Sequence, residues 1–373
     1  MSRPAKKNGR KVRVPFRRNR ARPRRVKDWI RQVSDADQGL DTLASESVVA
    51  KGDLSRQRTV IVPKDGAESA PSHRGTVVAV RGLVAEVDDG SRIWVCTLRR
   101  VLKTRVIARH HPIAAGDRVA FTVESDKDGV TREGVIESVA PRHGELKRRV
   151  GRRDRTIATN VDQVIIVTST EMPPPKPHLI DRYLLATLAG GMRPVICMNK
   201  IDLEEGAEVG RIVRLYESLG YPTLRTCAIS GAGVDRFREV LRDKASVVAG
   251  QSGVGKSSLL NMVQPGLKLR VGDIIEQTTK GRHTTSTAQL LRLDFGGYVV
   301  DTPGVKSFDV ACVPLAEIEM HFVEFSERLA NCRFPDCTHI HEPDCAIQAA
   351  VEAGDIDAGR YESYVRIFQE RAG

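Results

Sequence analysis

Residues 250–257 read Gly-Gln-Ser-Gly-Val-Gly-Lys-Ser, and this stretch decides the fold of the central part of the chain. It fits the spacing G-x-x-x-x-G-K-[ST], in which backbone N–H groups wrap phosphate oxygens between a strand and a helix. The lysine of this pattern reaches the β- and γ-phosphates, and the last hydroxyl meets Mg²⁺. We therefore expect a phosphate loop made of Gly250, Gln251, Ser252, Gly253, Val254, Gly255, Lys256, Ser257 and Ser258.

Two further motifs flank this loop in a rotated order. Asn199-Lys200-Ile201-Asp202 lies upstream, and Asp301-Thr302-Pro303-Gly304 lies downstream. The carboxylate of Asp202 can accept hydrogen bonds from both the ring N–H and the exocyclic amine of guanine, whereas adenine offers no such pair. The sequence therefore predicts a site for GTP rather than ATP.

Strands and helices alternate around these motifs. We expect strands at 164–168, 195–198, 223–227 and 245–249, and helices at 180–188, 209–219, 233–242 and 257–263. Such alternation predicts a doubly wound, mostly parallel sheet with ligand loops at the carboxyl ends of its strands. Asn199 and Gly250 both fall at such ends, which is the structural context that their motifs require.

Residues 73–141 show a different pattern, with short alternating strands expected at 76–80, 83–87, 92–98, 118–123 and 134–139. Five short strands with tight turns predict a β-barrel of the oligonucleotide-binding (OB) type. Trp94 and Phe121 are its only large aromatic residues, so stacking of bases on the barrel is not obvious. Two roles stay open for this barrel: it contacts RNA, or it only sets the distance between other parts of the protein.

A cluster of soft metal ligands marks the C-terminal region, 311–373, which we expect to be a mainly helical domain. The spacing C-x₄-C-x-H-x₅-C predicts one closed, structural zinc site rather than a catalytic one, and four incidental buried side chains are the less economical alternative. His341 is not assigned as a ligand. The ligands are Cys332, Cys337, His339 and Cys345. Upstream, a 3-4-3-4 apolar stripe predicts a helix with a buried face, formed by Leu315, Ile318, Phe322, Phe325 and Leu329.

The formal charge of +12 is concentrated at the N-terminus. Residues 1–31 hold 14 of the 59 basic side chains and one of the 47 acidic ones, which leaves 45 basic and 46 acidic side chains elsewhere. We expect 1–34 to be a disordered basic tail that orders on a polyanion, and 35–72 to be a linker. An organelle transit peptide is disfavoured because only one Ser precedes Ser34. A second basic cluster, 142–155, is either a solvated face or a phosphate contact.

At 373 residues the chain is long enough for two or three domains, and 40% hydrophobic residues suffice for globular cores. No apolar run approaches the ~20 residues that span a bilayer, so we expect no membrane association. The seven cysteines do not form the even framework of a small secreted protein. We therefore expect a cytoplasmic protein.

The motif order, the preceding barrel and the following Cys-Cys-His-Cys module together resemble the circularly permuted, small-ribosomal-subunit-dependent GTPases of the RsgA/YjeQ family. The stretch Gly281-Arg282-His283-Thr284-Thr285 is similar to switch I of that family, and Cys227-Ala228-Ile229 is similar to its fifth guanine-site element, which usually begins Ser-Ala. The resemblance implies a permuted G domain over 142–310. It also implies hydrolysis of GTP to GDP and phosphate that is stimulated by the small subunit, contact with its rRNA, and a role in its late maturation.

For catalysis we expect Lys256 to neutralise phosphate charge, and Thr285 to bind Mg²⁺ together with Ser257. We expect Asp301 to support the metal from its second coordination shell and the N–H of Gly304 to point toward the γ-phosphate. Many GTPases position water with a Gln after D-x-x-G, but residue 305 is Val, so we predict slow intrinsic hydrolysis with His283 as the replacement. His283 as a merely packed switch residue stays open. So do two other functions: a permuted GTPase of the large subunit, and a zinc-stapled RNA-binding protein with GTP as a structural ligand. We expect a monomer.

Overall fold

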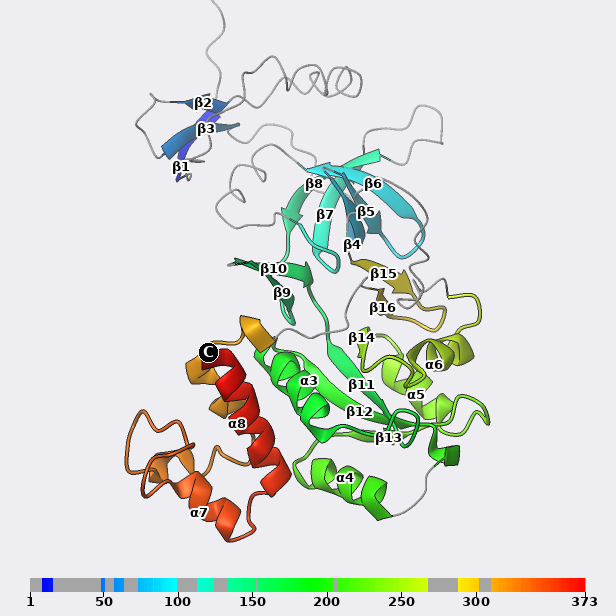
Figure 1. The fold of residues 1–373 in the computed structure, drawn as a ribbon. Helices are drawn as coiled ribbons and strands as arrows, with labels where there is room; N and C mark the ends of the chain where they lie inside the picture. The colour runs from blue at the N-terminus through cyan, green and yellow to red at the C-terminus, as the bar shows by residue number, and fades with distance from the viewer. Residues whose placement is uncertain are drawn as a thin grey trace, which may run out of the picture. The chain divides into compact units, whose positions relative to one another are not determined.

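The structure is a computed structural model, and Figure 1 shows its fold. Its arrangement is an N-terminal group of three strands, a β-barrel, a central α/β sheet and a C-terminal module. The described residues are 9–15, 48–50, 57–63, 73–82, 84–98, 113–123, 133–151, 153–203, 207–267, 288–301 and 310–372.

Three strands precede the barrel: β1 (Gly9–Pro15), β2 (Val48–Ala50) and β3 (Gln57–Pro63). They form an antiparallel sheet in the order β1-β3-β2, with Val12 opposite Val60. The sequence predicts a disordered tail over 1–34 and a linker over 35–72, so strands in these two segments are a correction. The difference has a visible origin in the sequence, because valines alternate with other residues in both Gly9–Pro15 and Gln57–Pro63, and this period of two is typical of strands.

The barrel confirms the expected five strands. They are β4 (His73–Arg81), β5 (Val84–Asp88), β6 (Ile93–Leu98), β7 (Arg118–Val123) and β8 (Glu133–Val139). Their order is β4-β5-β6-β8-β7, and β7 pairs with β4 to close the barrel. The β6–β8 pair is parallel, while the β5–β6 and β7–β8 pairs are antiparallel. This strand pairing is typical of the OB fold, a five-stranded Greek-key barrel.

A two-stranded hairpin, β9 (Leu146–Val150) and β10 (Arg153–Ala158), leads into the central sheet. The sheet contains β11 (Gln163–Ser169), β12 (Arg193–Asn199), β13 (Thr223–Arg225), β14 (Ala245–Ala249), β15 (Gln289–Arg292) and β16 (Tyr298–Asp301). Their order is β13-β12-β11-β14-β16-β15, and every pair is parallel except β15–β16. The predicted doubly wound sheet is thus confirmed.

Helices cover both faces of this sheet (Figure 1). Val164 and Ile166 of β11 pack with α3 (Pro177–Ala189) and α4 (Ala207–Ser218), while Ile165 and Val167 pack with α5 (Val234–Leu241) and α6 (Lys256–Val263). Successive residues of a strand point to opposite faces, so a strand buried on both sides is apolar throughout. The short turn η1 (Ile201–Leu203) follows β12.

The C-terminal module ends in α7 (Ala346–Glu352) and α8 (Ala358–Ala372). The helix predicted from the apolar stripe is wrong, because the backbone there forms the short 3₁₀ turns η3 (Leu315–Glu317), η4 (Glu319–His321) and η5 (Leu329–Asn331), and η2 (Val310–Cys312) precedes them. Phe322 ends η4 with an extended backbone, φ −95° and ψ 95°. The predicted burial is right for the centre of the stripe, since Ile318, Phe322 and Phe325 are fully buried.

The chain divides into two compact units. The first comprises Met1–Gly75, Gly82–Ile113 and Val119–Ala140, and the second comprises Thr76–Arg81, Ala114–Arg118 and Pro141–Gly373. The second unit therefore holds the central sheet, the hairpin and the C-terminal module. Within the described part of the chain, no helix combines the length and apolar character that a membrane span needs.

Candidate nucleotide site and metal cluster

The N-K-x-D element and the phosphate loop lie side by side in the structure. β12 and β14 are both parallel to β11, so Asn199, the last residue of β12, and Gly250, which follows β14, lie at the same edge of the sheet. Asn199 Nδ2 donates a hydrogen bond to the carbonyl oxygen of Val254 at 2.8 Å. The N-K-x-D element therefore contacts the phosphate loop directly, as a shared nucleotide site requires.

Two glycines of the phosphate loop have no room for a side chain. Gly250 has φ 142°, and a Cβ there would lie 2.0 Å from the carbonyl oxygen of Val167. Gly255 has φ 94°, and a Cβ there would lie 2.3 Å from Asn199 Nδ2. These positions need glycine both for their backbone angles and for the close approach of β11 and the N-K-x-D element.

The phosphate-loop lysine points back over its own loop. Lys256 Nζ donates to the carbonyl oxygens of Gly250 at 2.9 Å and Gln251 at 2.7 Å. The ammonium group is therefore positioned above the concave side of the loop, where successive N–H groups and the start of α6 provide a phosphate site. Ser257 lies in the first turn of α6, where a hydroxyl can serve a metal ion.

The base-recognition side is built from three adjacent loops. The thiol of Cys227 donates to Asp202 Oδ1 at 3.0 Å, and Thr226 Oγ1 donates to Asn199 Oδ1 at 3.1 Å. Asp202 is exposed, as a residue that meets a ligand must be, while Cys227 is buried behind it. Ala228 is partly buried and Ile229 is 88% exposed. The Cys in place of the expected Ser thus keeps a donor toward the carboxylate.

Asp301 ends β16 and is buried, next to the strand that feeds the phosphate loop. The remaining predicted residues of the switch segments lie outside the described residues. These are His283, Thr284, Thr285, Gly304 and Val305.

Comparison with known proteins decides the family. The model of the RsgA GTPase family matches residues 139–311. The "Small ribosomal subunit biogenesis GTPase RsgA" of Thermotoga petrophila is 40% identical over 305 residues, which cover 80% of this chain and 97% of the relative. The chain belongs to the RsgA GTPase family. It is therefore a GTPase, and its rotated motif order is the family's circular permutation.

Two solved structures are similar to this chain over nearly their whole length. The crystal structure of YjeQ from Thermotoga maritima has a TM-score of 0.66 and 37% identity, and covers 81% of this chain and 99% of its own. The structure of YloQ, described as a circularly permuted GTPase, has a TM-score of 0.62 and 28% identity, with coverages of 82% and 98%. The predicted barrel and permuted G domain are thereby confirmed.

The RsgA chain also carries a cluster that could hold a metal ion. The ligand atoms of Cys332, Cys337, His339 and Cys345 all lie within 4.8 Å of one another, and three of the four residues are buried. His339 Nδ1 lies 3.5 Å from the sulfur of Cys332 and 3.4 Å from that of Cys345. A tetrahedral zinc ion with ordinary bond lengths puts a ligand nitrogen about 3.6 Å from a ligand sulfur, so the donor set fits.

Two carboxylates that the sequence analysis missed organise this cluster. Glu319 Oε2 lies 3.0 Å from His339 Nε2, which leaves Nδ1 as the metal-binding nitrogen. Glu342 accepts from the backbone N–H groups of Thr338, Ile340 and His341 at 2.8, 3.1 and 3.2 Å. Burial raises the pKa of Glu342, but hydrogen bonds from the Thr338 hydroxyl and from nearby backbone N–H groups outweigh burial and hold the pKa well below its usual range. A Glu within a Cys-His run is the sequence signal that was available for Glu342.

A buried charge cluster joins α8 to α3. Arg360 donates to Asp181 Oδ1 at 2.5 Å and to both oxygens of Glu324, at 2.8 and 3.1 Å. The hydroxyl of Tyr216 on α4 also donates to Asp181, at 2.7 Å. Side-chain exposure is 2% for Arg360, 0% for Asp181 and 7% for Glu324. The C-terminal module is therefore fixed to the helix that follows β11 by an ion cluster shielded from water.

Part of the second basic cluster is structural. Arg142 makes two 2.7 Å hydrogen bonds to the buried Asp117, Arg149 pairs with Asp154, and Lys147 pairs with Glu145. Arg148 and Arg155 stand directly opposite each other on β9 and β10, and both are exposed. Neither has an ion-pair partner among the residues that the structure describes. Like charges directly opposite each other are unfavourable.

Proposed function

We propose that this chain is a ribosome-stimulated GTPase that binds the small ribosomal subunit through its rRNA and acts in the late maturation of that particle. The observation that carries the nucleotide part is the hydrogen bond from Asn199 to Val254, which joins base recognition to the phosphate loop. Relatives named as small ribosomal subunit biogenesis GTPases support the choice of particle.

In this proposal the nucleotide lies across the carboxyl edge of the sheet. Asp202 binds the guanine ring, with the Cys227–Ala228–Ile229 loop beside it, and Lys256 binds the β- and γ-phosphates. Ser257 and Thr285 hold Mg²⁺, which neutralises phosphate charge during hydrolysis. Asp301 supports the metal through its water shell, and the N–H of Gly304 binds the γ-phosphate.

We further infer that His283 positions the attacking water, because Val305 cannot orient it. Single-turnover hydrolysis on small subunits tests this inference. His283→Ala should slow the step while GTP binding is kept, and an unchanged rate would remove His283 from the mechanism.

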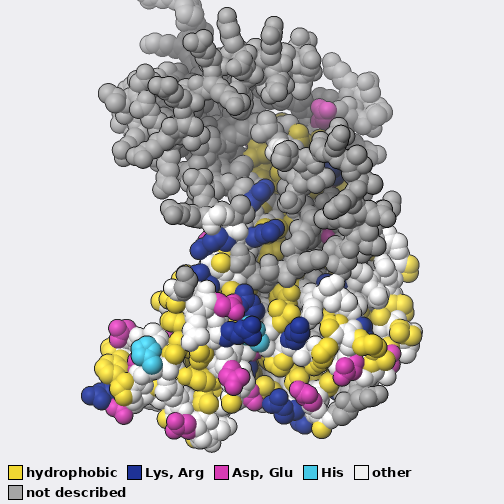
Figure 2. Space-filling view, in the orientation of Figure 1, with side chains coloured by type: hydrophobic (Ala, Val, Ile, Leu, Met, Phe, Trp, Pro, Cys, Tyr) yellow, Lys and Arg dark blue, Asp and Glu magenta, His cyan; other side chains and the backbone are white. Residues whose placement is uncertain are grey.

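RNA binding is assigned first to the hairpin β9–β10. On the face drawn in Figure 2, described Lys and Arg side chains are mixed with Asp and Glu over the lower part of the molecule. Within the described residues, Arg148 and Arg155 combine exposure, facing positions and like charge. Each phosphate that a cation neutralises releases counterions, so binding should weaken steeply with salt.

The salt dependence of binding to small subunits tests this assignment. The double change Arg148→Ser, Arg155→Ser should lower the slope of log K against log salt by about two. Lys147→Ser is the matched control, because Glu145 already pairs with that lysine. Equal slopes for the double variant and the wild type would exclude the hairpin as an RNA contact.

The Cys-His cluster is proposed to hold one zinc ion with a structural role, since all four ligand positions are filled by protein side chains. We also propose that the protein acts as a monomer in the cytoplasm, without a membrane partner. The main test of the whole function is GTP turnover with and without purified small subunits. Turnover should be slow alone and strongly stimulated by small, but not large, subunits. Stimulation by large subunits alone, or no turnover with either, would contradict the proposal.

A further inference from the structure

The structure assigns Lys176 as a further phosphate contact: we propose that its ammonium group binds the γ-phosphate of GTP from the α3 side of the phosphate loop. The inference rests on the proposed nucleotide site. It makes Lys176 a residue that sets the preference for GTP over GDP, although it belongs to none of the recognised guanine-site motifs.

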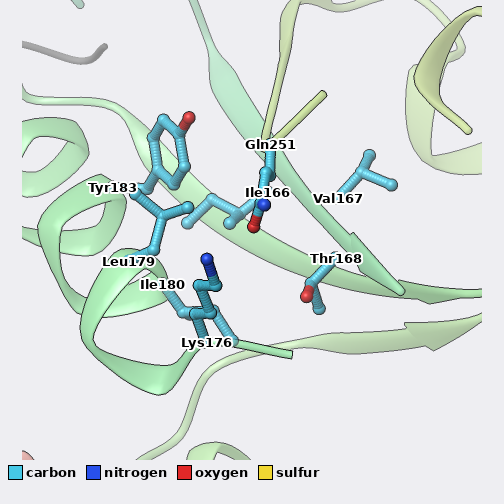
Figure 3. Close-up of a pocket in the computed structure, with 8 residues that line it drawn as sticks. All are labelled: Ile166, Val167, Thr168, Lys176, Leu179, Ile180, Tyr183 and Gln251. Atoms are coloured by element: carbon cyan, nitrogen blue, oxygen red, sulfur yellow. The ribbon is translucent and has the colours of Figure 1, made fainter. Parts of the chain in front are cut away.

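Lys176 borders a hollow beside the phosphate loop. The hollow is partly open to solvent and lies between β11, the first turns of α3 and Gln251. Figure 3 shows the side chains of Lys176 and Gln251 pointing toward each other across it, with the ring of Tyr183 at the far side. Because Gln251 is part of the phosphate loop, a cation in this hollow lies beside that loop.

The backbone at Lys176 is held in place by proline on both sides. Lys176 is the N-terminal capping residue of α3 with φ −120° and ψ 95°, and Pro177 begins the helix. A residue before proline is largely confined to extended conformations, so Pro177 restricts Lys176, and Pro175 precedes it with its own fixed φ. The backbone that carries the Lys176 side chain is thus stiff.

The loop before Lys176 runs along both nucleotide motifs. Lys200 of the N-K-x-D element donates from Nζ to the carbonyl oxygen of Met172, and Ser169 Oγ donates to that of Pro173 at 2.6 Å. The ring of Pro173 lies 3.7 Å from the place that a Cβ of Gly253 would occupy. The loop that carries Lys176 is therefore fastened between base recognition and the tip of the phosphate loop.

The ammonium group of Lys176 is unpaired within the described part of the protein. Lys176 is exposed, and no hydrogen bond or ion pair joins its ammonium group to another described residue. By contrast, Lys147 is paired with Glu145 and Lys200 is bound to Met172. An unpaired cation beside a phosphate loop favours the nucleotide with the greater negative charge, and GTP carries the γ-phosphate that GDP lacks.

Equilibrium binding of a non-hydrolysable GTP analogue and of GDP to the full chain, with Mg²⁺ present, tests the proposal. Lys176→Gln should weaken binding of the analogue about tenfold and of GDP less than twofold, because a hydrogen bond to a charged group is lost only with the analogue. Lys176→Arg should keep most of the preference. Lys147→Gln, which removes the same charge from a paired lysine, should change neither affinity.

Equal weakening of both nucleotides by Lys176→Gln, or no weakening of either, would overturn the assignment while wild-type selectivity for guanine nucleotides upheld the proposed function. A wild-type protein that binds no guanine nucleotide would overturn both. If Lys176→Gln changed only the affinity for small subunits, the lysine would be an RNA contact and the assignment would again be wrong.

Discussion

Replacing Arg360 by Met should be among the most destabilising single changes in the C-terminal module. The substitution keeps a side chain of similar length but leaves the carboxylates of Asp181 and Glu324 buried without their cation. Burial acts to lower the pKa of Arg360, yet the two carboxylates outweigh burial and raise it above its usual value. The guanidinium therefore stays charged in the folded state, and the cluster depends on it.

The magnitude follows from how dry the cluster is. Removing one partner of a buried ion pair costs about 3–5 kcal/mol, a large part of the 5–15 kcal/mol that stabilises a typical domain. The chain offers a matched control, because Arg182 on α3 pairs with Glu370 on α8 across the same helix contact, with side chains that are 26% and 42% exposed. Exposed pairs are worth about 0–1 kcal/mol, so Arg182→Met should cost no more than that.

Urea unfolding with metal present, followed by far-UV circular dichroism, measures both variants. We expect Arg360→Met to unfold at much lower urea concentration than Arg182→Met. Adding Asp181→Asn to Arg360→Met should recover part of the loss, because one of the stranded charges is then gone. Equal, small losses for Arg360→Met and Arg182→Met would refute the view that this cluster fixes α8 to α3.

Three further predictions concern single side chains. Glu319→Ala should weaken zinc retention against a chelator about 10- to 100-fold, whereas Glu319→Gln, which keeps an acceptor for His339, should lose less; equal retention by both variants and the wild type would count against a role for Glu319. Burial, with Arg366 and Arg182 nearby, lowers the pKa of His178, so its contribution to stability is present above about pH 6.5 and is lost as the pH falls toward the lowered folded value. His178→Asn should therefore reduce the drop in thermal midpoint between about pH 7.5 and about pH 5.5, and an unchanged drop would contradict this. Cys227→Ala should weaken GTP binding about fivefold, the loss of ~1 kcal/mol for one hydrogen bond to Asp202, and Cys227→Ser should not; calorimetry on both variants decides.

The sequence predicts most of the nucleotide site because its chemistry is written in short, contiguous motifs. Asn199 and Gly250 were placed at strand ends, and parallel pairing then brings those ends to one edge. The stripe from 315 to 329 was misread for a physical reason. The spacing of apolar residues indicates which side chains are buried, and Phe322 and Phe325 are indeed buried. It does not fix the backbone conformation, and the extended backbone at Phe322 prevents a continuous helix.

Contacts between residues that are far apart in the sequence could not be predicted from the sequence alone. Arg142 read as one of seven basic residues of 142–155, yet its partner, the buried Asp117, lies 25 positions upstream. Arg360 and Asp181 are 179 positions apart and meet only once α8 packs on α3. The sequence shows that a residue is basic, but it does not show whether that residue pairs with a carboxylate in the folded protein.

The most direct test of the account is calorimetric binding of GTP and ATP to the wild-type chain and to Asp202→Asn. Two hydrogen bonds to a charged carboxylate predict that the wild type holds GTP about a hundredfold or more tighter than ATP, and that Asp202→Asn loses most of this difference. Similar affinities of the wild type for the two nucleotides would contradict the account at its centre.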